Sequence, residues 1–134
     1  MIFIDTSGLL AALVEQDQYH KEAYKFWNEI VLSKEDCTTS ILVLNETINL
    51  LSRRCSYEFA YQIAEKLFAS KLLNILRTNI EDEKNALELL KKYSDQKISY
   101  TDCVSFVLMK KNKIKRAFTF DQHFNYVGLT KLPN

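Results

Sequence analysis

The feature that most constrains the fold is the start of the chain, where the apolar residues 1–4 run without a break into Asp5, Thr6 and Ser7. An unbroken apolar run of this length is typical of a strand buried on both faces, as in a parallel sheet covered by helices. Because an ionised Asp cannot lie inside such a strand, we expect Asp5 at its C-terminal end, the edge at which open α/β sheets bind ligands. Thr6 and Ser7 can cap the helix that residues 9–13 indicate, and on the alternative interpretation Asp5 only starts this helix.

The rest of the chain alternates between short apolar segments and segments with helical periodicity. Strands are predicted at residues 37–39, 72–76 and 117–121, with an edge strand at 127–132. The predicted helices span residues 19–32 and 41–54, and three more follow the candidate N-caps Ser56, Asn79 and Ser99. This alternation, with only two Gly and one Pro, favours an α/β fold with a parallel sheet over a β-sandwich. Because no linker or repeat divides residues 1–134, we expect a single domain.

The apolar positions of two helices, and the three cysteines, are expected in the core. The helix after Ser56 would turn inward Phe59, Ile63, Leu67 and Phe68, and the helix after Asn79 would turn inward Ala86, Leu87, Leu89, Leu90 and Tyr93. Cys37, Cys55 and Cys103 form no C-x-x-C pair and suit small buried residues in a reducing compartment. The chain starts without the basic segment of a signal peptide, and no apolar run approaches the ~18 residues of a membrane span, so we expect a cytoplasmic protein without membrane contacts.

Four acidic residues that lie far apart in the sequence are expected at one edge of the sheet. Asp5 and Asp121 each end a predicted strand, Glu46 follows the strand at 37–39, and Asp102 lies in the first turn of a late helix. Because the carboxyl ends of parallel strands meet at one edge, all four would face one cleft. Each also has an ordinary explanation, since Asp102 has the spacing of a capping box with Ser99, Glu46 can be a solvated residue and Asp121 can open a turn.

A cluster of four carboxylates is costly without a counter-ion. Two carboxylates ~4 Å apart repel by about 4 kcal/mol at an effective dielectric of 20, so without a cation at least one should keep its proton and have a raised pKa. Oxygen ligands suit Mg²⁺ or Mn²⁺ rather than zinc, and the two histidines have no zinc-site spacing. We expect His20 at the surface beside a helix start, whereas His123 follows the Asp121 edge and could touch a substrate.

The net charge of +1 does not demand a nucleic-acid partner, so any basic surface must be local. Lys and Arg side chains gather at the ends of two predicted helices, where they could meet phosphates or only complement the helix dipole. For Arg53 and Arg54 we expect the dipole role, and both roles stay open for the other cluster. That cluster comprises Lys110, Lys111, Lys113, Lys115 and Arg116.

Taken together, these residues resemble a PIN domain, and most of all its compact VapC-like toxin branch. The resemblance covers the whole chain and rests on residues 2–7, Asn45-Glu46, residues 99–102 and residues 119–124. It implies a three-layer α/β/α fold with a central, mainly parallel sheet of four to five strands. Thr101 stands where the family has a small residue before its aspartate, and no clear further acid follows the fourth acid of the motif.

The resemblance also implies catalytic residues and a cofactor. Asp5, Glu46, Asp102 and Asp121 match the family's acidic quartet, which resembles a site for one or two Mg²⁺ or Mn²⁺ ions. Thr119 and Thr6 match hydroxyl positions that would tune metal-bound water or phosphate. The implied activity is a metal-dependent endoribonuclease that hydrolyses RNA phosphodiester bonds, the toxin of a toxin–antitoxin pair. The implied partners are an RNA substrate, a small antitoxin that covers the cleft and a second copy in a homodimer.

Other functions fit the same start of the chain less well. A receiver domain would need paired acids after its first strand, where this chain has Thr6 and Ser7. A haloacid-type phosphatase would need a second Asp two residues after the first, at the position of Ser7. The remaining alternative is a non-catalytic PIN-fold module that binds RNA or protein.

Overall fold

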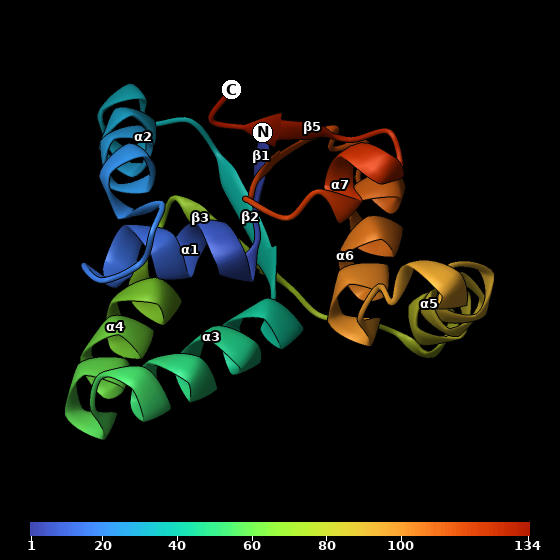
Figure 1. Cartoon of the computed structure of the whole chain (residues 1–134), viewed down its shortest axis with the longest axis horizontal. Helices are drawn as coiled ribbons and strands as arrows, with labels where there is room; N and C mark the ends of the chain where they lie inside the picture. Colours follow the sequence, from blue (N-terminus) through green and yellow to red (C-terminus); the bar gives the residue numbers. More distant parts are fainter.

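The computed structural model describes residues 1–134 and consists of seven α-helices around a five-stranded sheet (Figure 1). The strands are β1 (Ile2–Ile4), β2 (Cys37–Ser40), β3 (Leu73–Leu76), β4 (Arg116–Phe118) and β5 (Thr130–Leu132). The helices are α1 (Thr6–Leu13), α2 (His20–Ser33), α3 (Ile41–Arg54), α4 (Tyr57–Ala69), α5 (Ile80–Lys92), α6 (Tyr100–Lys111) and α7 (His123–Tyr126). No helix combines the length and the apolar content that are needed to span a bilayer.

All five strands are parallel and lie in the order β3-β2-β1-β4-β5. The predicted α/β fold with a central parallel sheet is therefore confirmed. The first strand lies in the middle, with Phe3 opposite Thr38 of β2 on one side and Ala117 of β4 on the other. The strand order reverses between β1 and β4, and a reversal of this kind marks the ligand-binding edge of an open α/β sheet. Asp5 directly follows β1 at that edge.

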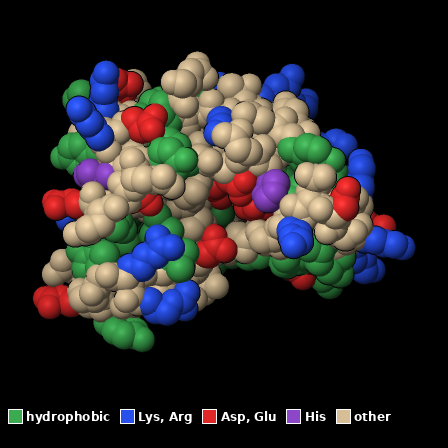
Figure 2. Space-filling model, in the orientation of Figure 1, with side chains coloured by type: hydrophobic (Ala, Val, Ile, Leu, Met, Phe, Trp, Pro, Cys, Tyr) green, Lys and Arg blue, Asp and Glu red, His purple; other side chains and the backbone are tan.

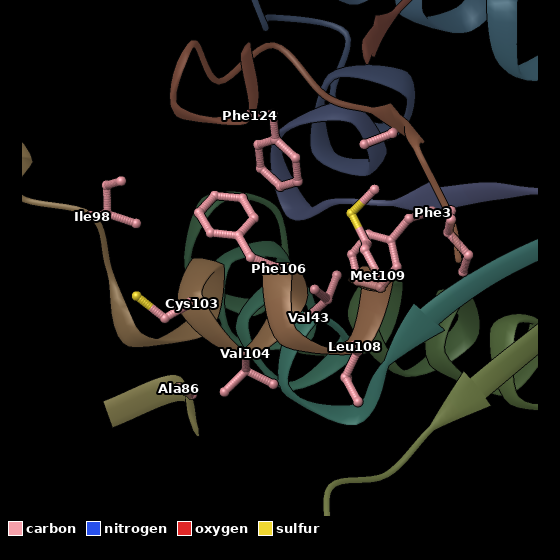
Figure 3. Close-up of a cluster of buried hydrophobic side chains, with 12 residues drawn as sticks. Phe3, Val43, Ala86, Ile98, Cys103, Val104, Phe106, Leu108, Met109 and Phe124 are labelled. Atoms are coloured by element: carbon pink, nitrogen blue, oxygen red, sulfur yellow. The ribbon is translucent and has the colours of Figure 1, made fainter. Parts of the chain in front are cut away.

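Helices cover both faces of the sheet, which gives the three layers. Side chains alternate along β1, so that Phe3 joins a core cluster with α5 and α6, whereas Ile2 and Ile4 join the opposite cluster with α1 and α2. Figure 1 shows α1, α2 and α4 on one side of the sheet and α5, α6 and α7 on the other. In the first cluster the rings of Phe106 and Phe124 meet edge to face, 5.0 Å apart (Figure 3). This contact joins α7 to α6 close to the expected active site.

Most helix starts have the predicted capping residues, but the prediction that Thr6 or Ser7 caps the first helix is wrong, because α1 begins at Thr6 itself. The hydroxyl oxygens of Ser56 and Ser99, and that of Ser40 before α3, accept backbone N–H groups at 3.0–3.1 Å. Asn79 forms a complete capping box with Asp82. Asp5 occupies the N-cap position of α1 but makes no side-chain cap. Asp5 therefore precedes the helix, but its carboxylate does not cap it.

Gly8 lets α1 begin unusually close to β4. A Cβ atom at this position would lie 2.4 Å from the carbonyl oxygen of Phe118, far inside van der Waals contact. The backbone N–H of Asp5 donates to the same Phe118 oxygen at 3.1 Å. The end of β1, the start of α1 and the end of β4 are thus held together at one point.

Several core assignments from the sequence are wrong, because they treat outer helix faces and edge strands as buried. The predicted strand at 72–76 exists as β3, but it is an edge strand and its side chains are only partly buried or exposed. Phe68 and Leu87 are 47% and 54% exposed, and Leu90 lies at the surface as well. Cys37 and Cys103 are buried as expected, whereas Cys55, the C-cap of α3, is exposed.

Candidate active site at the carboxyl edge of the sheet

Asp5 is buried and held by hydroxyl groups from two different elements. Its Oδ2 accepts hydrogen bonds from Thr119 Oγ1 at 2.7 Å and from Ser7 Oγ at 3.0 Å. The two hydroxyls lie 2.9 Å apart, and Ser7 Oγ also accepts the backbone N–H of Phe120 at 2.9 Å. The chain after β4 is therefore tied to the first turn of α1 through the Asp5 carboxylate, which fixes that carboxylate at the sheet edge.

Asp121 lies in the loop after β4 and not at the end of the strand itself. The strand is shorter than predicted and ends at Phe118, after which the backbone N–H of Asp121 donates to Thr119 Oγ1 at 3.1 Å. Asp121 Oδ1 accepts the backbone N–H of His123 at 2.9 Å, so Asp121 does open a turn. Its carboxylate nevertheless reaches Asp102, because ligand atoms of Asp102, Asp121 and His123 all lie within 4.8 Å of one another.

Asp102 and Glu46 come to this edge on helices. Asp102 lies in the first turn of α6, where its backbone N–H donates to Ser99 Oγ at 3.1 Å. Its carboxylate does not return a bond to Ser99, so the predicted capping box is only half formed. Glu46, in the second turn of α3, is half-buried. Neither carboxylate is occupied by a local structural bond.

One cleft of about 540 Å³ collects the predicted residues. All four acids and Thr6 line it. Thr119 does not line it, but its hydroxyl contacts the lining residues Asp5, Ser7 and Asp121. Figure 2 shows a patch of carboxylate side chains in the central hollow of this face, with a histidine beside it. The convergence that the sequence predicts for Asp5, Glu46, Asp102 and Asp121 is present in the structure.

The electrostatics of the cleft oppose full ionisation of the acids. Burial raises the pKa of Asp5, and hydrogen bonds from Thr119, Ser7 and the Thr6 backbone offset part of this rise, so that the resulting pKa is about 6. Burial also raises the pKa of Asp102 to about 8, with further contributions from the negative charges of Asp5, Asp121 and Glu46. A divalent cation would relieve this repulsion, and carboxylate oxygens are the ligands that Mg²⁺ and Mn²⁺ prefer. The donor set therefore fits a hard divalent metal ion.

Of the two hydroxyl residues that follow Asp5, Ser7 and not Thr6 makes hydrogen bonds in the site. Thr6 Oγ1 is buried without a hydrogen-bond partner, so its predicted role toward water or phosphate stays a prediction. Ser7 instead makes the contacts to Asp5, Thr119 and Phe120. One signal for Ser7 is present in the sequence, a hydroxyl two residues after the strand-ending Asp, but the same residue type also suits a helix start.

The basic residues that line the cleft do not belong to the Lys110–Arg116 cluster, for which the sequence left a phosphate contact open. Arg54 and Lys97 line the cleft, whereas none of the residues from Lys110 to Arg116 does. Lys110 lies about 12 Å along α6 from Asp102, Lys111 pairs with Asp82 at 3.1 Å, and Arg116 pairs with Glu35. Helical periodicity gives no signal for Arg54, because Arg53, seven residues after Glu46, lies closer to the direction of Glu46 on the helix.

Two aromatic rings and His123 complete the site, whereas His20 lies outside it. Tyr19 stacks on Phe120 with ring centroids 4.5 Å apart and an interplanar angle of 1°, and both rings line the cleft. Nothing in the sequence connects these two rings, which lie 101 positions apart. His20 begins α2 as expected, half-buried with Nδ1 2.8 Å from the Ala11 carbonyl oxygen. His123 lines the cleft beside Asp121, with its Nδ1 3.1 Å from Asp121 Oδ1.

Comparison with known proteins agrees with this geometry. The PIN domain family matches residues 2–129. The 23S rRNA-specific endonuclease VapC20 of Mycobacterium tuberculosis is 32% identical over 133 residues, which are 98% of each chain. The crystal structure of that protein, described as a sarcin-ricin loop cleaving toxin, matches with a TM-score of 0.88 and covers 97% of both chains at 30% identity.

More distant structures share the fold. FitAcB from Neisseria gonorrhoeae matches with a TM-score of 0.71 at 16% identity, covering 98% of this chain and 96% of its own. FitAB bound to a DNA fragment gives a TM-score of 0.70 at 15% identity, covering 98% of this chain and 94% of its own. The match over nearly the whole chain and the relative at 32% identity lead to one conclusion: the chain is a member of the PIN domain family.

Proposed function

We propose that this protein is a metal-dependent endoribonuclease that hydrolyses RNA phosphodiester bonds and acts as the toxin of a toxin–antitoxin pair. The observation that carries the proposal is the convergence of Asp5, Glu46, Asp102 and Asp121 in one cleft, where burial and mutual repulsion raise the pKa of two of them. Folding alone gives no reason to gather four acids. The relative VapC20, named as a 23S rRNA-specific endonuclease, supports RNA as the substrate class.

In this proposal the four acids hold one or two Mg²⁺ or Mn²⁺ ions. Such ions, when bound, neutralise charge on the phosphate and make a nucleophilic water available near neutral pH. The chain's own residues fix the geometry of the acids. Thr119 and Ser7 hold the Asp5 carboxylate by hydrogen bonds of 2.7 and 3.0 Å, so that one of its oxygens has a set position. Asp5, with its pKa raised to about 6, and Asp102, with its pKa raised to about 8, keep protons at lower pH in the absence of a cation.

RNA contacts would come from the rim of the cleft. Phosphates need cations near an acidic site, and Arg54 and Lys97 are the basic side chains that line it. Tyr19 is 38% exposed, and Phe120 covers one face of its ring. Unpaired RNA bases stack on aromatic rings of this kind, and a ring already held in place loses little conformational entropy on binding. The rim therefore suits an unpaired nucleotide beside the cleavage site.

The direct test is cleavage of a structured RNA by purified protein with Mn²⁺ or Mg²⁺. Cleavage should require the metal, stop with EDTA and fall to background in Asp5→Asn, because that variant keeps the hydrogen-bonding shape of the side chain but loses its charge. Asp36→Asn, which changes an exposed acid outside the cleft, is the matched control. Undiminished cleavage by a folded Asp5→Asn variant would exclude this cleft as the active site.

The same experiment addresses the alternative of a non-catalytic module. A PIN-fold module that only binds RNA or protein would retain RNA binding but show no metal-dependent cleavage under any condition. The presence of all four acids at the cleft argues against this alternative, since a binding groove for polyanionic RNA gains nothing from them.

A protein partner and a homodimer are part of the proposal. The α4 side chains Tyr57 and Tyr61 are 80% and 64% exposed, and with Phe68 they form an aromatic face on that helix. An antitoxin or a second copy could cover this face, which size-exclusion chromatography with light scattering would measure. Residues 1–134 are proposed to act as one domain, in the cytoplasm, where ribosomal RNA is found.

A further inference from the structure

His123 places a ring nitrogen beside the acids of the cleft. Its Nδ1 is shielded from solvent and makes no hydrogen bond, although it lies 3.1 Å from Asp121 Oδ1. The donor atoms of His123, Asp121 and Asp102 are within 4.8 Å of one another. Ligands ~2.2 Å from a shared ion lie about 3 Å apart when adjacent and about 4.4 Å apart when opposite. The three atoms are therefore spaced almost as ligands of one ion would be.

The position of this ring is set by its neighbours. The His123 backbone N–H donates to Asp121 Oδ1 at 2.9 Å, which keeps the ring next to that carboxylate. The next residue, Phe124, is fully buried against Phe106 of α6, the helix that carries Asp102. The His123 side chain is 32% exposed, and only its Nδ1 is a buried polar atom without a partner. The proton of the neutral ring can therefore sit on Nε2, which leaves the Nδ1 lone pair free to bind a cation beside the acids.

We propose that His123 supplies a nitrogen ligand to the divalent cation shared with Asp102 and Asp121, and that this ligand biases the site toward Mn²⁺ over Mg²⁺. The proposal rests on the cation site of the proposed function. Mg²⁺ binds oxygen ligands almost alone, whereas imidazole binds transition metals more strongly, so one nitrogen in an otherwise carboxylate site changes selectivity. It also accounts for the absence of a further acid after Asp121, because the residue two positions on provides a ligand of another kind.

Pulsed electron paramagnetic resonance of the Mn²⁺-loaded, tag-free protein tests the proposal without relying on activity. The echo-envelope modulation should show a directly bound ¹⁴N nucleus in the wild type. The signal should vanish in His123→Phe, which keeps a ring but removes the nitrogen. It should persist in His20→Gln, which removes the only other histidine of the chain. Melting temperatures of the metal-free proteins check that each variant folds.

The outcomes separate this inference from the proposed function. Mn²⁺ bound without ¹⁴N coupling, or with coupling that survives in His123→Phe, overturns the role of His123 and leaves the carboxylate site intact. Failure of the wild type to bind Mn²⁺ at all overturns both. Isothermal titration adds a second readout. His123→Phe should weaken Mn²⁺ binding on the order of tenfold, with a much smaller change for Mg²⁺, and an equal loss for both metals contradicts the proposed bias.

Discussion

The first turns of α5 and α6 share one sequence pattern and use it in opposite ways. Each helix follows a capping residue and carries an Asp three positions later, Asn79 with Asp82 and Ser99 with Asp102. Asp82 Oδ2 accepts the Asn79 backbone N–H at 3.1 Å, and its carboxylate pairs with Lys111 at 3.1 and 3.2 Å. Asp102 makes neither kind of contact. It faces the other acids of the cleft, which share its charge.

The electrostatic consequences differ in sign. The hydrogen bond from Asn79 and the Lys111 ammonium lower the pKa of Asp82, whereas burial and neighbouring carboxylates raise the pKa of Asp102 to about 8. The charge of Asp82 is satisfied inside the fold, and that of Asp102 is not. Of these two helix starts, the acid that belongs to the cleft is therefore the one without a local structural bond.

The largest expected difference between the two acids is in RNA cleavage. Asp102→Asn should reduce cleavage by at least about 10²–10³-fold, the scale at which loss of one preorganised electrostatic contact acts. Asp82→Asn should leave cleavage near the wild-type rate, since this residue lies outside the cleft. Initial rates with saturating Mn²⁺ measure both. Equal losses in the two variants would break the comparison.

Stability should respond in the reverse order. Asp82→Asn weakens the capping box and the pair with Lys111, and should lower the free energy of unfolding by about 1–3 kcal/mol. Near neutral pH the metal-free Asp102 carboxyl is largely protonated, because its pKa is raised to about 8. Asp102→Asn replaces it by another neutral group of similar shape, so the metal-free variant should be about as stable as the wild type. Urea unfolding in EDTA compares them. A marked destabilisation by Asp102→Asn would mean that its carboxylate has a structural partner.

The pH dependence of stability sharpens the same contrast. Unfolded Asp has a pKa of about 3.9. The folded-state pKa is raised to about 6 for Asp5 and to about 8 for Asp102. The protonated form of each residue therefore contributes to the free energy of unfolding in full below about pH 4. This contribution is lost as the pH rises through 6 for Asp5 and through 8 for Asp102. The pKa of Asp82 is lowered, so its contribution is present above about pH 4 and is lost as the pH falls.

Each variant should therefore flatten a different part of the metal-free stability profile. Asp102→Asn should reduce the decline between pH 4 and 8, and Asp82→Asn should reduce the decline below pH 4. Urea midpoints at closely spaced pH values, all in EDTA, provide the measurement. An unchanged slope between pH 4 and 8 in Asp102→Asn contradicts the raised pKa.

Two tyrosines extend the contrast between cleft and outer surface to aromatic residues. Tyr19 lines the cleft and stacks on Phe120, whereas Tyr24 of α2 is 53% exposed and does not line the cleft. Loss of one base-stacking contact costs about 1–3 kcal/mol, so Tyr19→Ala should weaken RNA binding by about 5–150-fold. Tyr24→Ala should have no such effect. Binding to single-stranded RNA can be measured with the inactive Asp102→Asn protein as the background.

The smallest expected effect separates the basic residues. Arg54→Gln should reduce the slope of log K against log salt concentration by about 1, the value for one lost phosphate contact, because Arg54 lines the cleft. Lys113→Gln, in the cluster at the far end of α6, should leave the salt slope unchanged. Plots of the binding constant against salt concentration compare the two. If only Lys113→Gln changed the salt slope, RNA would instead run along the larger groove beside α5 and α6, which Lys113 lines.

The sequence predicts well what depends on periodicity and strand ends. The run at residues 1–4 forms a buried central strand, and the acid that ends it lies at the ligand-binding edge of the sheet. Asp102 and Asp121 reach the same cleft because α6 begins and β4 ends at that edge. Order and spacing of elements are sufficient for these conclusions.

What the sequence could not predict depends on how side chains from distant segments meet. Arg54 at the end of α3 looks like an ordinary partner of the helix dipole, and only the packing of α3 turns it toward the cleft. The exposed Phe68 and Leu87 have helical spacing like that of buried residues, because periodicity does not reveal how far a partner surface extends. The role of Ser7 depends on Thr119 and Phe120, more than 110 residues away.

The central claim is that acids from distant parts of the chain hold a divalent cation at the sheet edge. The most direct measurement is the Mn²⁺-dependent shift of the melting temperature in the wild type, Asp82→Asn and Asp102→Asn. At a free Mn²⁺ concentration 100 times its Kd, mass action should add about 2.7 kcal/mol to the stability of the wild type. Asp82→Asn should gain the same stability from Mn²⁺, although its metal-free melting temperature is lower, and Asp102→Asn should gain little. No shift in the wild type, or equal shifts in all three proteins, would contradict the claim.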